Sequence, residues 1–453
     1  MKENKTLYEL TLAQEVPILQ CKYTLFKKVI NILASVETKE NIDADLMKKA
    51  FDIAMERNDC TRLRFVKQDK KLMQYFEENV VLDIPRLTFT TKEEQDAFIK
   101  KQSKGAIKWK KGEVIKPFFI NTYDGKFMIF FKICHVIFDI YGLNFFINDL
   151  FSVYKALEKG EDLPAAPKKY EDLIKKDLVE KHDIKKHDED YDYFEKQYSS
   201  NPEPYYAGFD GLTNKTMIKT RGKGQRPAKM FFFRNSTKMY GHEIPQDVTD
   251  KLLEYAKQSQ TTIANLLFYL CSVTQSRMNG DVPFMLPLEL CNCRGTLLAK
   301  KCGGTKVQSL ACLTEVNKDL PFSENLKKFV EEQNDNYRHI GLRDMEREVQ
   351  LHRIYKTSVM STYYSLTFSF IPYSRTADFK VKFYSNERCA LPAYLAVMYN
   401  IDDNSIAIGY DCQVNLVTEK NVEVFHNNLI SAIEQVTANP DMLIKDIVMK
   451  EKN

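Results

Sequence analysis

Hydrophobic positions in the first half of the chain change their spacing repeatedly, which predicts helices alternating with strands. A helix is expected where apolar residues recur every three or four positions, and a strand where a short apolar run is bounded by polar residues. Residues 61–66 and 72–76 are predicted strands close enough in sequence to pair as a hairpin. The other predicted elements of this half are helices at residues 6–34, 42–58 and 91–104 and a strand at residues 117–122.

One segment, residues 126–157, joins both kinds of spacing. It opens with an apolar run from Phe127 to Cys134, whose length and content of Phe and Ile predict a buried strand. It closes with a helix whose apolar residues share one face up to Leu157. His135 and Asp139 lie in the turn between them, where burying polar groups without partners is costly. We therefore treat this turn as the candidate functional centre of the chain.

The second half begins after a connection at residues 160–175 that contains two prolines and many charges. A solvated helix is expected at residues 171–198, followed by a long loop at residues 199–229 whose sequence RGKGQRP either contacts phosphate or is simply solvated. We place an N-terminal lobe at residues 1–175 and a C-terminal lobe at residues 176–453. The further predicted strands are residues 230–234, 284–290, 307–313, 365–370, 395–399 and 405–410, and the further helices are residues 245–258, 261–277 and 419–437.

The end of the chain echoes the candidate centre. Residues 406–436 repeat the order of strand, turn and helix, but the turn lacks the histidine and the aspartate. This echo indicates two related halves, of which only the first carries the candidate chemistry.

Composition and charge narrow the class of protein. The chain has 453 residues, which is too long for a single core and predicts two or more domains. Hydrophobic residues make up 44% and charged residues 28%, as in ordinary globular proteins, and the net charge of +4 gives no electrostatic case for a nucleic-acid partner. We find no signal peptide and no uninterrupted apolar window long enough for a membrane helix. The ten cysteines lack the spacing of a disulfide scaffold, so we expect a cytoplasmic protein with reduced thiols.

The residue types in the turn suit acid–base chemistry. At the end of a buried strand, desolvation favours the neutral imidazole, which can accept a proton from, or orient, an attacking amine or hydroxyl. Asp139 could pair with an arginine or cap the helix that begins beside it. On spacing alone, a buried histidine with satisfied hydrogen bonds and a helix cap remain an equally good structural explanation.

Several cysteines and histidines could bind a metal. Cys291, Cys293 and Cys302 lack the paired Cys-x-x-Cys spacing of zinc sites, which favours buried free thiols. His182 and His187 lie among lysines and aspartates, which favours a solvated helix face. We therefore predict no metal site.

Cys134 precedes His135 directly and could be read as a thiol nucleophile activated by the histidine. Side chains alternate along a strand, however, so the two would point to opposite faces. We therefore favour a structural thiol at this position.

The segment KICHVIFDIYGL resembles the His-His-x-x-x-Asp-Gly signature of condensation domains from nonribosomal peptide synthetases. These domains belong to a superfamily that includes chloramphenicol acetyltransferase, carnitine acyltransferases and plant acyltransferases. Weaker resemblances follow in the family's order along nearly the whole chain. They are LTLAQEVPILQ with Ala13 and Gln14, ERNDCTRLRF with Arg57, Asn58 in place of a histidine, Arg62, Arg64 and Phe65, KYEDLIKKD with Tyr170 and Asp172, YDYFEKQY with Phe194 in place of tryptophan, LPLELCNCRGTL and NPDMLIKDI.

The resemblance implies a role for each residue of the turn. His135 would be the catalytic histidine, and Asp139 the structural aspartate with Arg294 as a salt-bridge partner linking the two lobes. Cys134 replaces the first histidine of the signature, and Ile140 replaces its glycine, although Gly142 lies close by. A β-branched residue does not readily adopt positive φ. The resemblance also implies a substrate tunnel beside Cys134, Ile140 and Gly142, which the bulk of Ile140 could narrow.

The resemblance also implies the fold and the reaction. We expect an α/β protein built from two chloramphenicol-acetyltransferase-like sandwich lobes in a V-shaped pseudo-dimer, with the site in a tunnel. A freestanding condensation-type acyltransferase would join an acyl or aminoacyl group, held as a phosphopantetheine thioester, to an amine or hydroxyl acceptor in nonribosomal peptide or related natural-product biosynthesis. No carrier-protein serine motif occurs in these residues, so an acyl or peptidyl carrier protein would act in trans. We expect a monomer with no bound cofactor and no membrane or nucleic-acid partner.

Two alternatives stay open. The first is an acyltransferase that uses acyl-coenzyme A as donor and a small O- or N-acceptor, because nothing in the sequence distinguishes the two thioester donors. The second is a catalytically silent relative that serves as a binding protein, and the residues at positions 134 and 140 are its support.

Overall fold

The chain forms two compact units in the computed structural model, which describes residues 5–22, 24–38, 42–211, 227–229, 235–374 and 379–450. Unit 1 comprises residues 1–183 together with two later segments, residues 292–308 and 375–386. Unit 2 comprises residues 184–291, 309–374 and 387–453. The predicted boundary between residues 175 and 176 stays a prediction, and it falls inside helix α5 (Tyr170–Lys181).

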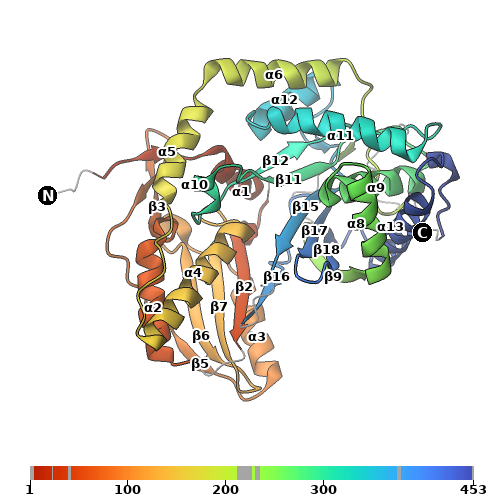
Figure 1. Ribbon diagram of the computed structural model, residues 1–453. Helices are drawn as coiled ribbons and strands as arrows, with labels where there is room; N and C mark the ends of the chain where they lie inside the picture. Colours follow the sequence, from red (N-terminus) through yellow and green to blue (C-terminus); the bar gives the residue numbers. More distant parts are fainter. Residues whose placement is uncertain are drawn as a thin grey trace. The chain divides into compact units, whose positions relative to one another are not determined.

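Unit 1 is built on a five-stranded sheet in the order β16-β2-β7-β6-β5 (Figure 1). All neighbouring strands pair antiparallel except β5 and β6, which are parallel. β16, which comes from the later segment, pairs with β2 along its whole length. The strands are β2 (Asn31–Thr38), β5 (Arg86–Thr88), β6 (Ile115–Asn121), β7 (Phe127–Cys134) and β16 (Phe379–Tyr384).

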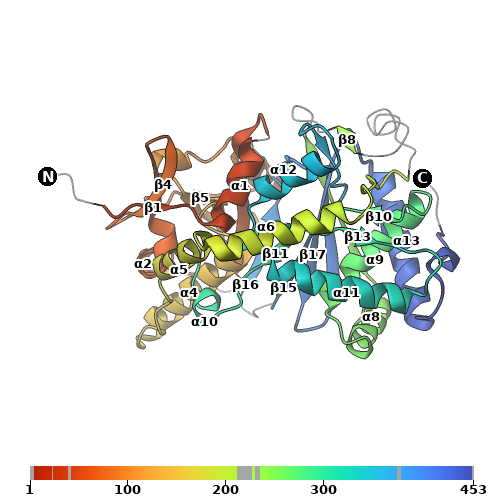
Figure 2. The ribbon, with the colours of Figure 1, turned by 90° about the horizontal axis from the view of Figure 1, so that it is seen from above.

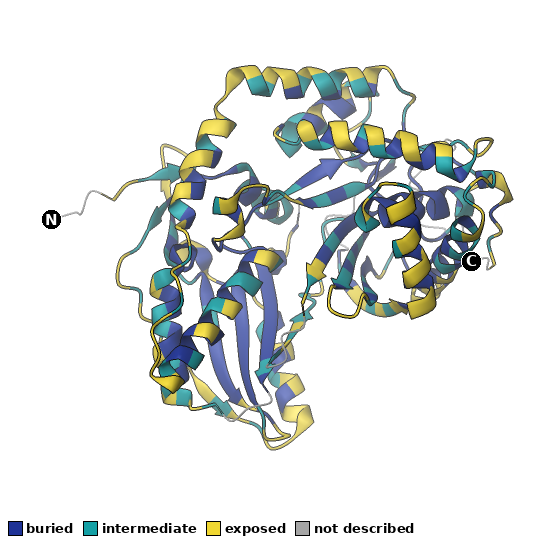
Figure 3. Cartoon of the chain, in the orientation of Figure 1, coloured by how far each residue is buried: buried dark blue, intermediate teal, exposed yellow. Residues whose placement is uncertain are grey.

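The central strand β7 is buried at all eight positions because helices cover both faces of the sheet (Figure 3). Phe131 packs in one core with Phe51 of α2 (Ala44–Arg57) and Phe146 of α4 (Ile140–Lys159). Phe130, which points the other way, packs in a second core with Ile99 of α3 (Lys92–Ser103). The double burial explains why the sequence shows a continuous apolar run here rather than an alternating one.

A smaller three-stranded sheet, β1-β4-β3, completes unit 1 and contains the predicted hairpin. Its strands pair antiparallel, and the hairpin of β3 and β4 confirms the prediction for residues 61–76. The elements are β1 (Tyr8–Glu9), α1 (Leu12–Lys22), β3 (Leu63–Gln68), β4 (Lys71–Phe76), α5 and the short α10 (Leu297–Lys300).

Two helix predictions need correction. The helix expected over residues 6–34 is shorter, because α1 ends at Lys22. Leu33 lies instead in β2, a largely buried strand of the sheet. The helix expected over residues 171–198 is two helices, α5 and α6 (Ile184–Ser199). In one continuous helix, Asp177 and Asp190 would point about 140° apart, because each residue turns the helix by about 100°. Both residues are buried, so the helix breaks between them and each part buries its own face.

Unit 2 contains a six-stranded sheet in the order β12-β11-β15-β17-β18-β9. β17 and β18 form the predicted antiparallel hairpin, whereas β15 is parallel to both β11 and β17. The strands are β9 (Thr237–Ile244), β11 (Leu288–Asn292), β12 (Val307–Ala311), β15 (Thr367–Tyr373), β17 (Ala393–Asn400) and β18 (Ile406–Gln413), and two-residue strands are β8 (Ala228–Lys229), β10 (Phe284–Met285), β13 (Thr314–Glu315) and β14 (Ser361–Thr362).

The helices of unit 2 were predicted in part. α8 (Gln246–Gln258), α9 (Ile263–Met278) and α13 (Glu419–Ala438) confirm three predictions. α11 (Phe322–Arg338) and α12 (Asp344–Ile354), seen with α6 in Figure 2, have no counterpart among the predictions, and neither has the edge strand β9. The strand predicted at residues 230–234 and most of RGKGQRP lie outside the described residues.

The predicted echo between the two halves holds in detail. β7 ends at Cys134 and Asp139 caps α4 five residues later, while β18 ends at Gln413 and Thr418 caps α13 five residues later. Each cap accepts a hydrogen bond from a backbone N–H in the first turn of its helix. Within the described ranges, no helix has the length and apolar character needed to span a membrane.

One carboxyl group is buried within unit 2. Glu289 of β11 is 6% exposed, and its carboxylate accepts hydrogen bonds from the Tyr337 hydroxyl (3.0 Å) and from Nε2 of Gln333 (2.5 Å). Burial raises the pKa of Glu289 to about 7, and the hydrogen bonds offset this only in part. Once protonated, the acid can donate to Tyr337, whose own hydroxyl donates to Asn265 (2.9 Å), so the neutral form leaves no donor or acceptor unmatched.

Glu289→Gln should therefore make the protein more stable at pH 8 and leave it almost unchanged near pH 4. The raised pKa means that the folded state keeps a proton that the unfolded chain loses above about pH 4.3. The free energy of unfolding of the wild type should thus fall between about pH 4.5 and 7, by about 1–3 kcal/mol, and this fall should shrink in the variant. Urea unfolding at several pH values measures the difference, with the exposed Glu331→Gln as control. Equal pH dependence in wild type and Glu289→Gln would contradict the raised pKa.

Candidate active site

The turn between β7 and α4 is held by its backbone and by its apolar side chains. The N–H of His135 donates to the carbonyl of Ile30 on the neighbouring chain segment (2.8 Å), and the N–H of Ile137 donates to Cys134 (3.0 Å). Val136, Ile137 and Phe138 are completely buried in the larger core of unit 1. The three residues between His135 and Asp139 therefore fix where both polar side chains are placed.

His135 as a whole is half-buried. Its Nδ1 atom, however, is fully buried and has no hydrogen-bond partner in the described part of the chain. Burial lowers the pKa of His135 because it desolvates the imidazolium, and the charge of Asp139 offsets this only in part. The imidazole is therefore neutral at physiological pH. A neutral imidazole can accept a proton from a reacting group through the ring nitrogen that carries no hydrogen.

Asp139 is 1% exposed and uses both carboxylate oxygens. Oδ1 accepts the N–H of Gly142 (2.6 Å), which caps α4, and a hydrogen bond from Nη2 of Arg294 (3.1 Å). Oδ2 accepts the N–H of Lys306 (2.7 Å). The carboxylate thus ties the start of α4 to a distant segment, which explains how the turn tolerates a buried charge.

Arg294 completes this anchor. Its Nη2 also donates to the carbonyl of Gly304 (2.8 Å), and its guanidinium lies 4.7 Å above the ring of Tyr141. The side chain is 4% exposed, so the ion pair with Asp139 is withdrawn from solvent. The predicted pair is therefore present. Arg294 lies in the predicted C-terminal lobe, but its segment, residues 292–308, packs in unit 1, so the pair closes within this unit.

The glycine that the turn requires is at position 142. A Cβ on Gly142 would lie 2.0 Å from the carbonyl oxygen of Gly304, so the first turn of α4 packs directly on the backbone of the 292–308 segment. Gly304 has φ +87° and faces Tyr170, whose hydroxyl donates to the carbonyl of Thr305 (2.9 Å). Ile140 is the first residue of α4 and has a helical backbone, so the expected conflict with positive φ does not arise.

Gly142→Ala should destabilise unit 1 by about 3 kcal/mol or more, because the new methyl group would collide with the backbone of Gly304, and backbone cannot move cheaply. Thermal and urea unfolding measure the loss. Gly105→Ala is the matched control, because a Cβ there meets nothing within 4 Å. Similar melting curves for the two variants would show that α4 and the segment of residues 292–308 do not pack this closely.

Comparison with known proteins identifies the family. The family model named Condensation domain matches residues 4–453. The chain belongs to the condensation-domain family. This confirms the predicted family and its mixed α/β fold class, and the tunnel that the family resemblance implies stays a prediction.

Solved structures of other condensation domains share the fold. A variant of the starter condensation domain of rhizomide synthetase, in complex with C8-CoA and Leu-SNAC, aligns with a TM-score of 0.79 at 15% identity over 98% of both chains. The first condensation domain of the calcium-dependent antibiotic synthetase, in complex with a substrate analogue, gives 0.78 at 12% identity over 98% of this chain and 99% of that one.

Curated relatives are much longer. A plipastatin synthase of Bacillus subtilis (strain 168) is 19% identical over 435 residues, which cover 93% of this chain and 16% of the relative. Surfactin synthase subunit 3 of the same organism is 22% identical over 473 residues, which cover 99% of this chain and 31% of the relative. The chain therefore spans less than a third of either synthase.

Cys134 of this condensation domain is completely buried, and burial raises the pKa of its thiol. A thiol that stays protonated is neither a nucleophile nor a base. Cys134 is thus a packing residue at the end of β7, as the alternation of strand side chains predicts.

The other positions that resemble family motifs build the framework of unit 1. The guanidinium of Arg57 lies 3.0 Å from a carboxylate oxygen of Asp149, and Asn58, which replaces a histidine of the motif, donates to the same carboxylate (2.8 Å). Gln14 pairs with the side chain of Gln74 (2.7 Å). These residues hold helices and strands together and do not take part in the turn.

Sequence reasoning missed two anchors of the site. Asp59 accepts the N–H groups of Tyr170 (2.8 Å) and Glu171 (3.0 Å) and so caps α5, and Lys306 forms a buried ion pair with Asp177 (2.7 Å). An aspartate cannot be assigned to a helix that starts 111 residues later without the fold. The only signal in the sequence was the resemblance of KYEDLIKKD, which contains Tyr170, to a family motif.

The metal candidates named from the sequence do not gather into one group in the described part of the chain. Among the described residues, no group of three or more His, Cys, Asp or Glu side chains is arranged to hold a metal ion. Cys291 and Cys302 are buried thiols, and Cys293 is partly exposed. His182 is exposed near Glu9, and His187 contacts Asp188 and Glu346 on the surface of unit 2.

Proposed function

We propose that this condensation domain is an acyltransferase that joins an acyl or aminoacyl group, held as a phosphopantetheine thioester, to an amine or hydroxyl acceptor. The observation that carries the proposal is the neutral imidazole of His135 at the end of a buried strand. The anchor formed by Asp139, Arg294 and the N–H of Lys306 supports it by fixing the turn.

The reaction needs one proton acceptor. The acceptor nitrogen or oxygen attacks the thioester carbonyl, and His135 takes the proton that this atom loses as the new C–N or C–O bond forms. The C–S bond then breaks, and the leaving thiolate takes the proton back from the imidazolium. His135 ends neutral, and the products are an amide or ester and a free thiol.

Positions 134 and 140, where the chain differs from the family signature, give no structural argument for a catalytically silent binding protein. Ile140 starts α4 without strain, and Cys134 is a packing residue. Two thioester donors are possible. We propose a carrier protein supplied in trans as the donor partner, with acyl-coenzyme A as second candidate, because the similar starter domain is described in complex with C8-CoA.

Mass spectrometry of reaction mixtures tests this proposal. The chain is incubated with a candidate amine and either an acyl-loaded carrier protein or the same acyl group on coenzyme A. Product from the loaded carrier alone supports the first donor, and product from acyl-coenzyme A alone supports the second. No product with either donor, across neighbouring pathway carriers and several amines, would favour a binding protein.

A further inference from the structure

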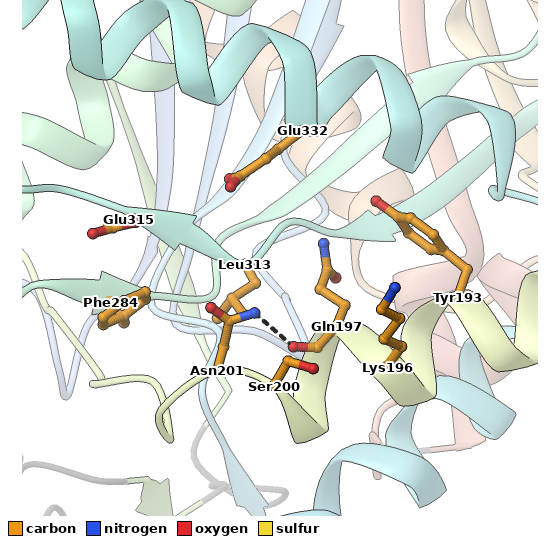
Figure 4. Close-up of a pocket in the computed structure, with 9 residues that line it drawn as sticks. All are labelled: Tyr193, Lys196, Gln197, Ser200, Asn201, Phe284, Leu313, Glu315 and Glu332. Atoms are coloured by element: carbon orange, nitrogen blue, oxygen red, sulfur yellow. Dashed lines mark hydrogen bonds between the residues drawn. The ribbon is translucent and has the colours of Figure 1, made fainter.

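A cavity of about 280 Å³ opens in unit 2, and no residue of the turn lines it (Figure 4). Its walls come from four elements of this unit, namely the last turns of α6, β10, β13 and α11. The volume lies just below the range of pockets for drug-sized ligands, so the cavity is large enough for a small metabolite. Three lining residues, Tyr193, Lys196 and Gln197, lie in the YDYFEKQY stretch, but the proposed function gives none of them a role.

One wall of the cavity is set by a directional chain of hydrogen bonds. Nε2 of Gln333 donates to the buried carboxylate of Glu289, and Oε1 of Gln333 accepts from Nδ2 of Asn336 (3.1 Å). Oδ1 of Asn336 then accepts from Nε2 of Gln197 and from the hydroxyl of Tyr193, both at 3.0 Å. Because a carboxylate ends the chain, the amide orientation of every member is fixed.

This series of hydrogen bonds does not use the side-chain oxygen of Gln197. Its Oε1 is buried and has no hydrogen-bond partner in the described part of the protein. Tyr193 is held in addition by stacking on His339, with ring centroids 4.1 Å apart and an angle of 12°. These hydrogen bonds and the stacked ring make the wall rigid.

The charges around the cavity have opposite signs on opposite walls. Glu332 points from α11 into the cavity, whereas Lys196 rises from α6 beside Tyr193 (Figure 4). Lys328 binds Glu315 directly and lies 3.9 Å from Glu332, so Glu332 keeps most of its hydrogen-bonding capacity. Lys196 has no ion-pair partner among the residues that the structure describes. A ligand with one cationic and one anionic group would match both walls.

Two residues that line the cavity are apolar. Leu313 is buried beside β13, and Phe284 of β10 is partly exposed to the cavity. An apolar side chain of a ligand would remove both from water, which favours binding in proportion to the area covered.

We propose that this cavity binds a free α-amino acid with an apolar side chain. Its ammonium group donates to Glu332, its carboxylate pairs with Lys196, and its side chain covers Leu313 and Phe284. The site lies wholly in unit 2 and does not depend on the acyl transfer proposed for His135.

Isothermal titration of the whole chain with L-leucine, L-valine and L-phenylalanine tests the proposal. We expect saturable binding at one site for at least one of them, weakened about tenfold or more by Glu332→Gln or by Lys196→Met. Glu331→Gln, which removes the same charge from the exposed neighbouring position, should bind like the wild type. N-acetyl-L-leucine and L-leucinamide, which each lack one of the two charges, should bind at least about tenfold more weakly than L-leucine.

Three results would overturn the proposal. They are the absence of saturable binding for all three amino acids, an equal loss in Glu331→Gln and Glu332→Gln, and equal affinity for L-leucine and N-acetyl-L-leucine. His135→Ala separates this site from the turn, since it should bind the amino acid as tightly as the wild type whether or not acyl transfer occurs. Loss of binding in His135→Ala would likewise contradict a site confined to unit 2.

Discussion

His135→Ala should abolish acyl transfer and leave the fold intact. The imidazole is the neutral proton acceptor of the turn, and alanine at this position removes it without touching the backbone hydrogen bond to Ile30. Loss of a general base typically lowers the rate by about 10²–10⁴. Product formation by mass spectrometry measures the rate, and a thermal melt checks the fold. Full activity in this variant would rule out His135 as the catalytic residue.

A matched control and a pH profile sharpen this test. His182→Ala removes an exposed histidine of the same unit and should leave the rate unchanged. Because burial lowers the pKa of His135, the base stays neutral below the ordinary histidine pKa of about 6.5. The rate should therefore persist at pH 6.5 and fall only at lower pH, as the imidazole takes up a proton. A fall that begins well above pH 6.5 would point to a different titrating group.

Asp139→Ala should mainly lower stability. The substitution removes the cap of α4 and leaves the guanidinium of Arg294 buried with Gly304 as its remaining partner. Breaking a buried ion pair from one side costs about 3–5 kcal/mol, which is a large part of the stability of an ordinary domain. Urea unfolding and the yield of folded protein measure the effect.

The exposed cap of α2 provides the comparison for Asp139. Asp43 accepts two backbone N–H groups but faces solvent and has no buried arginine beside it. Asp43→Ala should therefore cost only about 1 kcal/mol. If Asp139→Ala lost turnover with an unchanged melting curve, the carboxylate would act in the chemistry and its structural role would be wrong.

The turn also shows how far a signature can be transferred by position. In the family signature a glycine follows the aspartate directly, and this chain has Ile140 there. The structure shows that the residue after Asp139 only has to start a helix, whereas the close backbone contact occurs at Gly142. The requirement for glycine arises from the carbonyl of Gly304, which is 162 positions away and invisible to local sequence reasoning.

The sequence by itself determined the elements whose periodicity is complete within one segment. β7, α4 and the turn between them follow from residues 127–157, because a strand buried on both faces and an amphipathic helix each leave a local pattern. The hairpins of β3–β4 and β17–β18 followed for the same reason. α11 and α12 were missed although α11 is strongly amphipathic, and their largely charged sequences masked the pattern.

Only the tertiary structure decided what holds the candidate site. Arg294, Gly304 and Lys306 meet Asp139 because the segment of residues 292–308 packs in unit 1 while its neighbours in sequence belong to unit 2. Contacts of this kind leave no periodic trace, since each depends on a single side chain or carbonyl brought close by the fold. His135 could be named from its motif, but its neutral state follows from burial, which exists only in the folded chain.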